Sequence, residues 1–444
     1  MNKIRLSEHF TYTKLLRFVF PSITMMIFTS IYSVVDGLFV SNYAGKTPFA
    51  ALNLIYPLLM ITGALGFMVG TGGTAIVART LGEGRREDAN RYFTMLVWVT
   101  VIGGVIITLA GQIFLPAIAV LFGASGEILD NCVLYGRIVQ MAMPFFMLQN
   151  VFQSFFVTAE KPKLGLAVTV ASGCTNIVLD ALFVAVFSWG LAGAALATAI
   201  SQIVGGTVPL IYFSKENSSL LRFCKTKYYG RVLANTCING SSELMNSVAS
   251  SIVTILFNFQ LLRLAGADGV AAFGVIAYIS FIFAAIFLGY AVGSAPIVGF
   301  HYGAGHPDEL KSLLRKSLTL MGLGGIAMTL LSLALSAPVS RIFVGYDAGL
   351  YAMTVRGFRI YSAAFLLCGF NIYGSAFFTA LNNGLVSAVI SFLRSLVFQS
   401  VCVLLLPIFL GLDGIWLALL ASELLSLAVT VCFLIKNGKK YRYI

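Results

Sequence analysis

The sequence predicts an all-α membrane protein with twelve transmembrane helices, in two six-helix lobes related by a pseudo-two-fold axis along the membrane normal. Three observations support this fold class: the composition, the length of the apolar runs and an internal repeat. Of the 444 residues, 59% are hydrophobic and 10% are charged, whereas soluble domains are typically about 45–50% apolar and about 25% charged. This composition argues against a soluble enzyme, a nucleic-acid-binding protein and a disordered protein.

The apolar runs are long enough to cross a bilayer, and Gly, Pro and charged residues separate them. We expect twelve spans, at residues 15–41, 48–73, 92–115, 132–157, 163–187, 190–213, 232–262, 269–295, 317–337, 351–380, 385–409 and 414–435. The first run is too long for a signal-peptide core and lacks a small-residue cleavage site, so we expect it to be retained.

The basic residues gather in the segments that these spans place on one side of the membrane. Most of the 29 Lys and Arg precede span 1, follow span 12 or lie in the loops after spans 2, 4, 6 and 8. By the positive-inside rule, both termini are cytoplasmic and the protein is a multi-pass protein of the cell membrane. The rule also explains the net charge of +12, so no nucleic-acid partner is needed.

The chain repeats itself at a constant offset of 221 residues. The pairs include Gly45 with Gly266, Gly84 with Gly305, and the segment 190–201 with 411–422. We therefore expect an N-terminal lobe at 1–214, a cytoplasmic linker at 215–230 and a C-terminal lobe at 231–444. Because six spans is an even number, both halves enter the membrane from the same side, as in secondary transporters that rock two halves around a central site. A duplicated channel or scaffold is the alternative.

Carboxylates inside the first half predict a cation site. Asp36 in span 1, Asp180 in span 5 and Thr198 in span 6 lie at a similar depth, and Asn176 is one helical turn from Asp180. Placing a charged side chain in the bilayer costs a few kcal/mol, so we expect each such residue to have a structural or functional role. These oxygens suit Na⁺, or the two carboxylates could share a proton. The alternative is that each aspartate only bonds a neighbouring helix.

The second half differs chemically from the first. At the positions that correspond to Asp36 and Asp180 it has Phe257 and Val401, so we expect no cation site there at that level. It has two carboxylates of its own inside spans. Glu243 lies either at the start of a helix that lines a cavity or at the membrane interface. Glu423 has either a packing role or a functional one. Arg394 in span 11 could neutralise either glutamate, and the sequence does not decide the roles of Glu423 and Arg394.

No motif for catalysis or for cofactor binding is present. The seven cysteines have no paired spacing, so we expect neither disulfides nor a metal site beyond Na⁺ at the cation site. No nucleophile–base arrangement or nucleotide-binding loop is complete. We therefore expect a protein that is not an enzyme and has no cofactor, with H⁺ or Na⁺ as the coupling ion.

Four motifs carry a resemblance to a known family. They are Val34-Val35-Asp36-Gly37-Leu38-Phe39, Ala75-Ile76-Val77-Ala78-Arg79-Thr80-Leu81-Gly82-Glu83-Gly84, Phe155-Phe156-Val157-Thr158-Ala159 with Lys161-Pro162, and Asn176 with Asp180. The chain resembles, over essentially its whole length, the multidrug and toxic compound extrusion (MATE) family, in its DinF-like branch near the MepA-type members. The resemblance implies two six-helix lobes and efflux driven by inward H⁺ or Na⁺.

The resemblance also implies roles for particular residues. The first-lobe cation site of related branches uses residue types that fall on Asp36, Asn176, Asp180 and Thr198. Polar positions near that site match Tyr32, Tyr135 and Gln153. Glu243 resembles a second-lobe glutamate of other branches, but Asn371 stands where those branches have an aspartate, which argues against coupling by the second lobe alone.

We therefore expect a secondary active multidrug efflux transporter that exchanges H⁺ or Na⁺ for lipophilic or cationic small molecules by alternating access. Its expected partners are drug-like substrates and membrane lipids, and we expect a monomer. The alternative is a flippase for a lipid-linked or polyprenyl-linked substrate, which would need several basic residues for a pyrophosphate head group. Few basic residues lie inside spans, among them Arg137 and Arg394, which counts against it. Substrate identity and coupling ion stay open.

Overall fold

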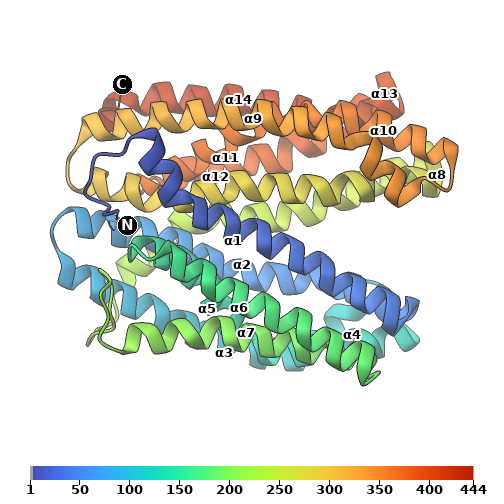
Figure 1. Cartoon of the computed structure of the whole chain (residues 1–444), viewed down its shortest axis with the longest axis horizontal. Coiled ribbons are helices and arrows are strands. Elements are labelled where there is room, and N and C mark those ends of the chain that lie inside the picture. Colours follow the sequence, from blue (N-terminus) through green and yellow to red (C-terminus); the bar gives the residue numbers. More distant parts are fainter. Residues whose placement is uncertain (1–3, 444) are drawn as a thin grey trace.

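The computed structural model describes residues 4–443, without the side chains of Val34, Leu38 and Lys46, and this part of the chain is helical with no strand. The helices form two groups, α1 to α7 and α8 to α14 (Figure 1). Their bounds are α1 Tyr12–Phe39, η1 Val40–Ala44, α2 Lys46–Gly82, α3 Arg86–Leu121, α4 Gly126–Met141, α5 Met143–Thr158, α6 Pro162–Asp180, η2 Ala181–Val186, α7 Gly190–Ser214, α8 Gly230–Gly303, α9 Pro307–Val344, α10 Ala348–Ser362, α11 Phe365–Ala380, α12 Gly384–Phe392, η3 Leu393–Phe398, α13 Gln399–Leu410 and α14 Leu412–Tyr441.

The twelve predicted spans are confirmed, although several of them differ from simple rods. In the described residues, nine helices are long and apolar enough to cross a membrane. One of these, α8, holds two spans that meet at Gly266, where the backbone leaves the helical conformation. The fourth span breaks at Ala142, between α4 and α5, next to Pro144, which cannot donate a backbone hydrogen bond. The tenth bends by 47° between α10 and α11.

Glycines with positive φ lie at corresponding helix boundaries and breaks in both halves, which confirms the internal repeat at the level of the backbone. An L-residue with a side chain rarely adopts this conformation, but glycine does so freely. The three pairs are Gly45 and Gly266 (φ 102° and 64°), Gly84 and Gly305 (78° and 70°), and Gly190 and Gly411 (54° and 58°).

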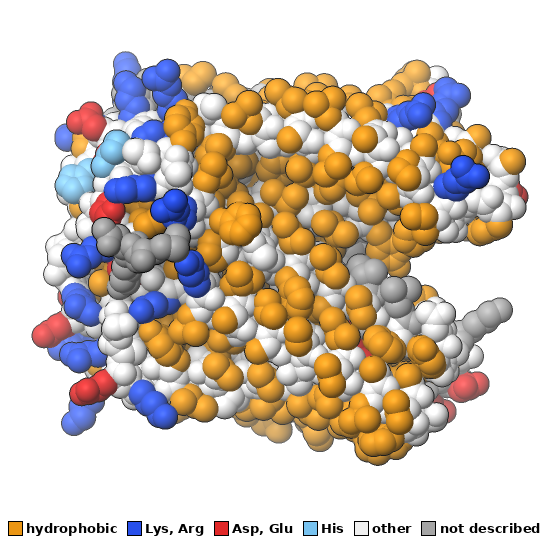
Figure 2. All heavy atoms as spheres, viewed as in Figure 1, with side chains coloured by type: hydrophobic (Ala, Val, Ile, Leu, Met, Phe, Trp, Pro, Cys, Tyr) orange, Lys and Arg blue, Asp and Glu red, His pale blue; other side chains and the backbone are white. Residues whose placement is uncertain are grey.

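Both termini lie at one end of the molecule, which we call the basic end (Figure 1). Figure 2 shows Lys and Arg side chains gathered there, whereas a broad hydrophobic band covers the middle of the molecule. This distribution is the one that the positive-inside rule describes.

The lobes touch at the basic end through a seam of glycines, which we call the glycine seam. A Cβ atom on Gly72 would lie 2.0 Å from the carbonyl oxygen of Thr236, and one on Gly303 would lie 2.0 Å from that of Arg79. Only a residue without a side chain fits at these positions, so α2 and α8 pack backbone to backbone. At the opposite end the lobes are separated by a cleft (Figure 2).

Candidate cation-binding site

Helices α1, α6 and α7 of the first lobe carry the predicted cation site. Asp36 lies in the last turn of α1, and Asp180 is the last residue of α6. Each helix then continues as a π-helix, η1 and η2 respectively, and the two π-helices contact each other. Short π-helical turns occur frequently at functional sites. Both carboxylates therefore lie where a regular helix changes its backbone geometry.

Gly173 allows α6 to approach α1 closely. A Cβ atom at this position would lie 2.5 Å from the Phe28 ring and 2.9 Å from the Tyr32 ring. A larger residue would hold the helices apart. Asn176 and Asp180 follow Gly173 along the same helix, and the close approach brings them towards Asp36.

The structure brings the two predicted carboxylates together. The carboxyl groups of Asp36 and Asp180 lie close enough to influence each other electrostatically. Asp180 is fully buried, and Asn176 is only 2% exposed. Neither oxygen of Asp180 and neither polar atom of the Asn176 amide has a well-formed hydrogen bond with the described residues. The same holds for Asp36 Oδ1 and Thr198 Oγ1.

Buried polar atoms without partners cost free energy, about 1–3 kcal/mol for each neutral group and more for a charged one. A cation, or a proton on one carboxyl group, would remove this cost because it neutralises the like charges and gives the oxygens a partner. The donor set consists of carboxylate, amide and hydroxyl oxygens, which are the ligands that hard cations such as Na⁺ prefer. The site is therefore chemically suited to either ion.

Two tyrosines lie beside the carboxylates. Tyr32 lies in electrostatic contact with Asp36 and approaches Gln149 of α5. Tyr135 is buried, lies within electrostatic range of both aspartates, and its hydroxyl approaches Thr198. These contacts connect α1, α4, α5 and α7 in one polar cluster.

Residues that the sequence analysis did not name extend this cluster. Gln149 lies one turn before Gln153 on α5, both are buried, and Oε1 of Gln153 has no partner among the described residues. Tyr56 of α2 lies within electrostatic range of Tyr32 and Asp36. The four-residue spacing of the two glutamines could have indicated Gln149, because residues four apart share a helix face. Nothing in the sequence indicates Tyr56.

Glu243 does not belong to this cluster. It lies half-buried on α8 in the second lobe. It has no electrostatic interaction with Asp36, Asp180 or Tyr135 in the described part of the chain. Any role of Glu243 therefore has to be separate from the carboxylate pair.

The second lobe has an aromatic pair where the first lobe has Asp36. Phe257, at the corresponding position, is 3% exposed and stacks on Phe273 with 4.7 Å between ring centroids. Val401, which corresponds to Asp180, is exposed. At this level the described part of the second lobe offers no carboxylate.

The carboxylate that the second lobe buries has a complete set of partners. Arg394 Nε and Nη2 both donate to Glu423, at 2.8–3.1 Å. Asn371 Nδ2 donates to Glu423 Oε2 at 2.6 Å, and Thr430 Oγ1 donates to Asn371 Oδ1 at 3.0 Å. Glu423 is fully buried. Of the two glutamates that Arg394 could neutralise, the structure pairs it with Glu423.

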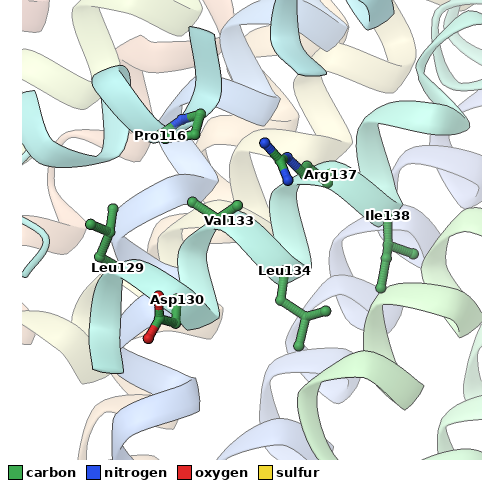
Figure 3. A pocket seen from close by; sticks show the side chains of 7 residues that line it. All are labelled: Pro116, Leu129, Asp130, Val133, Leu134, Arg137 and Ile138. Atoms are coloured by element: carbon green, nitrogen blue, oxygen red, sulfur yellow. The ribbon is translucent and has the colours of Figure 1, made fainter. Parts of the chain in front are cut away.

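Arg137, the other basic residue inside a predicted span, lies on the outer surface of the first lobe. It borders a cavity of about 490 Å³ with Pro116, Val133 and Leu134 (Figure 3). Gln112 Nε2 donates to its carbonyl oxygen at 2.9 Å. Arg137 and Arg394 are therefore in different lobes and do not form a common basic site.

The described residues contain no group of three or more His, Cys, Asp or Glu side chains that could hold a metal ion. All seven cysteines are free.

Comparisons with known proteins relate the whole chain to one family. The MatE family model matches residues 21–182 and 244–404. The Multidrug export protein MepA of Staphylococcus aureus (strain NCTC 8325 / PS 47) is 22% identical over 429 residues, which cover 95% of this chain and 94% of that protein. The Multidrug export protein MepA of Staphylococcus haemolyticus is 27% identical over 213 residues, 48% of this chain and 47% of that protein.

Solved structures share the fold. A crystal structure of MATE in complex with MaL6 superposes with a TM-score of 0.93 at 21% identity and covers 98% of both chains. The outward-facing conformation of a multidrug resistance MATE family transporter of the MOP superfamily also gives a TM-score of 0.93 at 21% identity, over 100% of this chain and 99% of that one.

Proposed function

The chain belongs to the MatE family, and on this premise we propose that it is a secondary active exporter of lipophilic or cationic small molecules, coupled to inward movement of H⁺ or Na⁺. The observation that carries the proposal is the carboxylate pair of Asp36 and Asp180, buried in the first lobe without hydrogen-bond partners for most of its oxygens. A buried pair of like charges is costly unless it is neutralised. Binding of a cation at this pair on one side of the membrane and its release on the other would couple transport to the free energy of the ion gradient.

In this proposal Asp36 and Asp180 bind the cation, with Asn176 and Thr198 as neutral ligands. Tyr32, Tyr135 and Gln153 are the proposed cavity or substrate residues near the pair. A site that cannot hold the cation and the substrate together gives the mutual exclusion that antiport needs. We propose that ion binding bends or rotates α1, because Asp36 lies between Pro21 and the π-helix η1, and both interrupt regular helix geometry.

We also propose that the lobes comprise residues 1–214 and 231–444, joined by 215–230, and that both termini are cytoplasmic. The basic end carries the Lys and Arg side chains that favour this orientation. We propose a monomer with no enzymatic activity and no cofactor. The flippase alternative lacks support, because Arg137 and Arg394 are in different lobes and Arg394 is already paired with Glu423.

Transport by purified protein in proteoliposomes tests the proposal. With an imposed proton or sodium gradient, Asp180→Asn should abolish gradient-driven efflux of all substrates, because an amide takes up no proton and brings no negative charge to hold Na⁺. Asp130→Asn is the matched control: it makes the same chemical change on the exposed surface of the same lobe and should transport normally. Coupled efflux by Asp180→Asn at the wild-type rate would refute the proposed site.

A further inference from the structure

A polar cavity of about 700 Å³ lies between the two lobes at the basic end. The first lobe contributes Arg79 and Glu83, at the end of α2, and Arg85, which precedes α3. The second lobe contributes Arg231 and Asn235 from the first turns of α8. Arg79 belongs to one of the motifs that carry the family resemblance, and nothing in the proposed transport cycle uses it.

The cavity has surplus positive charge. Its three arginines face one acidic lining residue, Glu83, which pairs with both Arg79 and Arg85, and Arg85 also pairs with Asp88 outside the lining. Arg231 forms no ion pair with any residue in the described part of the chain. Arginine stays charged at all relevant pH values and presents several N–H donors in a planar fork. The second-lobe wall of the cavity therefore holds a cation that lacks a counter-charge.

The start of α8 adds to the positive potential beside Arg231. Tyr229, the residue before this helix, does not cap it with a side-chain hydrogen bond. The first N–H groups of a helix point out of its N-terminus and carry partial positive charge, which favours a bound anion. This feature supports the arginines and would not define a site without them.

Exposed apolar side chains border the same cavity. Ile238 of α8 is 53% exposed and Leu385 of α12 is 70% exposed. A soluble phosphate would use only the arginines, whereas a lipid would use the arginines for its phosphate and the apolar border for an acyl chain. Basic pockets between transmembrane helices on the cytoplasmic side are typical binding places for anionic lipid head groups.

We propose that this cavity between the lobes binds the phosphate group of an anionic lipid, held by Arg79, Arg85 and Arg231, with an acyl chain along Ile238 and Leu385. Because both lobes form its walls, a bound lipid holds them together at the basic end. On the basis of the proposed function, such a lipid favours the conformation that is closed at this end. The binding itself does not depend on the transport mechanism.

Thermal unfolding of the full chain in detergent tests the proposal without any measurement of transport, so its failure is distinct from failure of the coupling site. Phosphatidylglycerol should raise the melting temperature more than phosphatidylethanolamine. In Arg231→Gln, the phosphatidylglycerol concentration for half the effect should rise about fivefold, the factor expected for one basic residue near an anionic head group. The control Arg222→Gln removes the same charge from the exposed linker, outside the cavity, and should respond as wild type.

Two further measurements make the result decisive. Arg231→Lys keeps the charge and should keep the preference for phosphatidylglycerol, even if Arg231→Gln is poorly folded. Inorganic phosphate alone distinguishes the two sources: an equal, Arg231-dependent stabilisation by inorganic phosphate would support the anion site but assign it to a soluble ligand. Equal responses to the two lipids, or the same change in Arg231→Gln and Arg222→Gln, would overturn the proposal.

Discussion

Removing the charge of Glu423 should destabilise the second lobe strongly, although the first-lobe carboxylates would be untouched. Glu423 is fully buried and accepts hydrogen bonds from Arg394 and Asn371. The Arg394 side chain is only 14% exposed. In Glu423→Gln, the guanidinium would stay buried without a counter-charge, and breaking a buried pair in this way costs about 3–5 kcal/mol.

A double variant separates the buried charge from the loss of contacts. Arg394→Met combined with Glu423→Gln removes both charges, and the glutamine can still accept from Asn371. Replacing a buried ion pair by groups of similar volume is often neutral, so the double variant should recover about 2–4 kcal/mol relative to Glu423→Gln.

The measurement is reversible chemical unfolding, in detergent, of the wild type, Glu423→Gln, the double variant and a control variant. Met328→Leu provides a control for an apolar change inside the same lobe, with an expected cost below about 1.5 kcal/mol. If Glu423→Gln costs less than 1 kcal/mol, or if the double variant is no more stable than Glu423→Gln, the ion pair does not stabilise the lobe as argued.

Two other predictions concern the second lobe and the contact between lobes. Glu243→Gln should weaken transport of cationic substrates more than of neutral ones, since a carboxylate in the cavity wall attracts positive charge. Transport rates measured with cationic and with neutral substrates test this. If the variant instead uncouples transport from the ion gradient, the roles of the two lobes are reversed. Gly72→Ala should impair closure of the basic end, because its Cβ would lie 2.0 Å from the Thr236 carbonyl oxygen. Distances between spin labels placed on the two lobes would report this change. The control Gly103→Ala, with open space around its Cβ, should leave these distances unchanged.

The sequence predicted those parts of the fold that depend on local composition and on the repeat. Apolar runs located the spans, and the offset of 221 residues located the glycine pairs at corresponding helix boundaries and breaks. The bend before Phe365 was not predicted, because an uninterrupted apolar run does not show where a helix changes direction.

For the candidate site, depth along the helices was enough to associate Asp36 with Asp180, since both lie near the same end of their spans. Their functional role stays a prediction. The partners of Glu423 could not be predicted, because Arg394 and Asn371 come from different helices and only tertiary packing decides which glutamate Arg394 meets. Tyr56 was missed for the same reason: α2 reaches the site through its packing, and no spacing in the sequence encodes that contact.

The glycine seam has a consequence for the entropy of the contact between the lobes. Gly72 and Gly303 have no rotamers to lose, so joining α2 to α8 there costs no side-chain conformational entropy, whereas a contact made by Lys, Met or Glu side chains would cost up to about 2 kcal/mol for each one fixed. Backbone-to-backbone contact also needs no rearrangement of interlocked side chains before it separates. If the proposed transport opens and closes this contact, each step needs only a small net change in free energy, and a ligand needs only a modest difference in affinity to favour one conformation over the other.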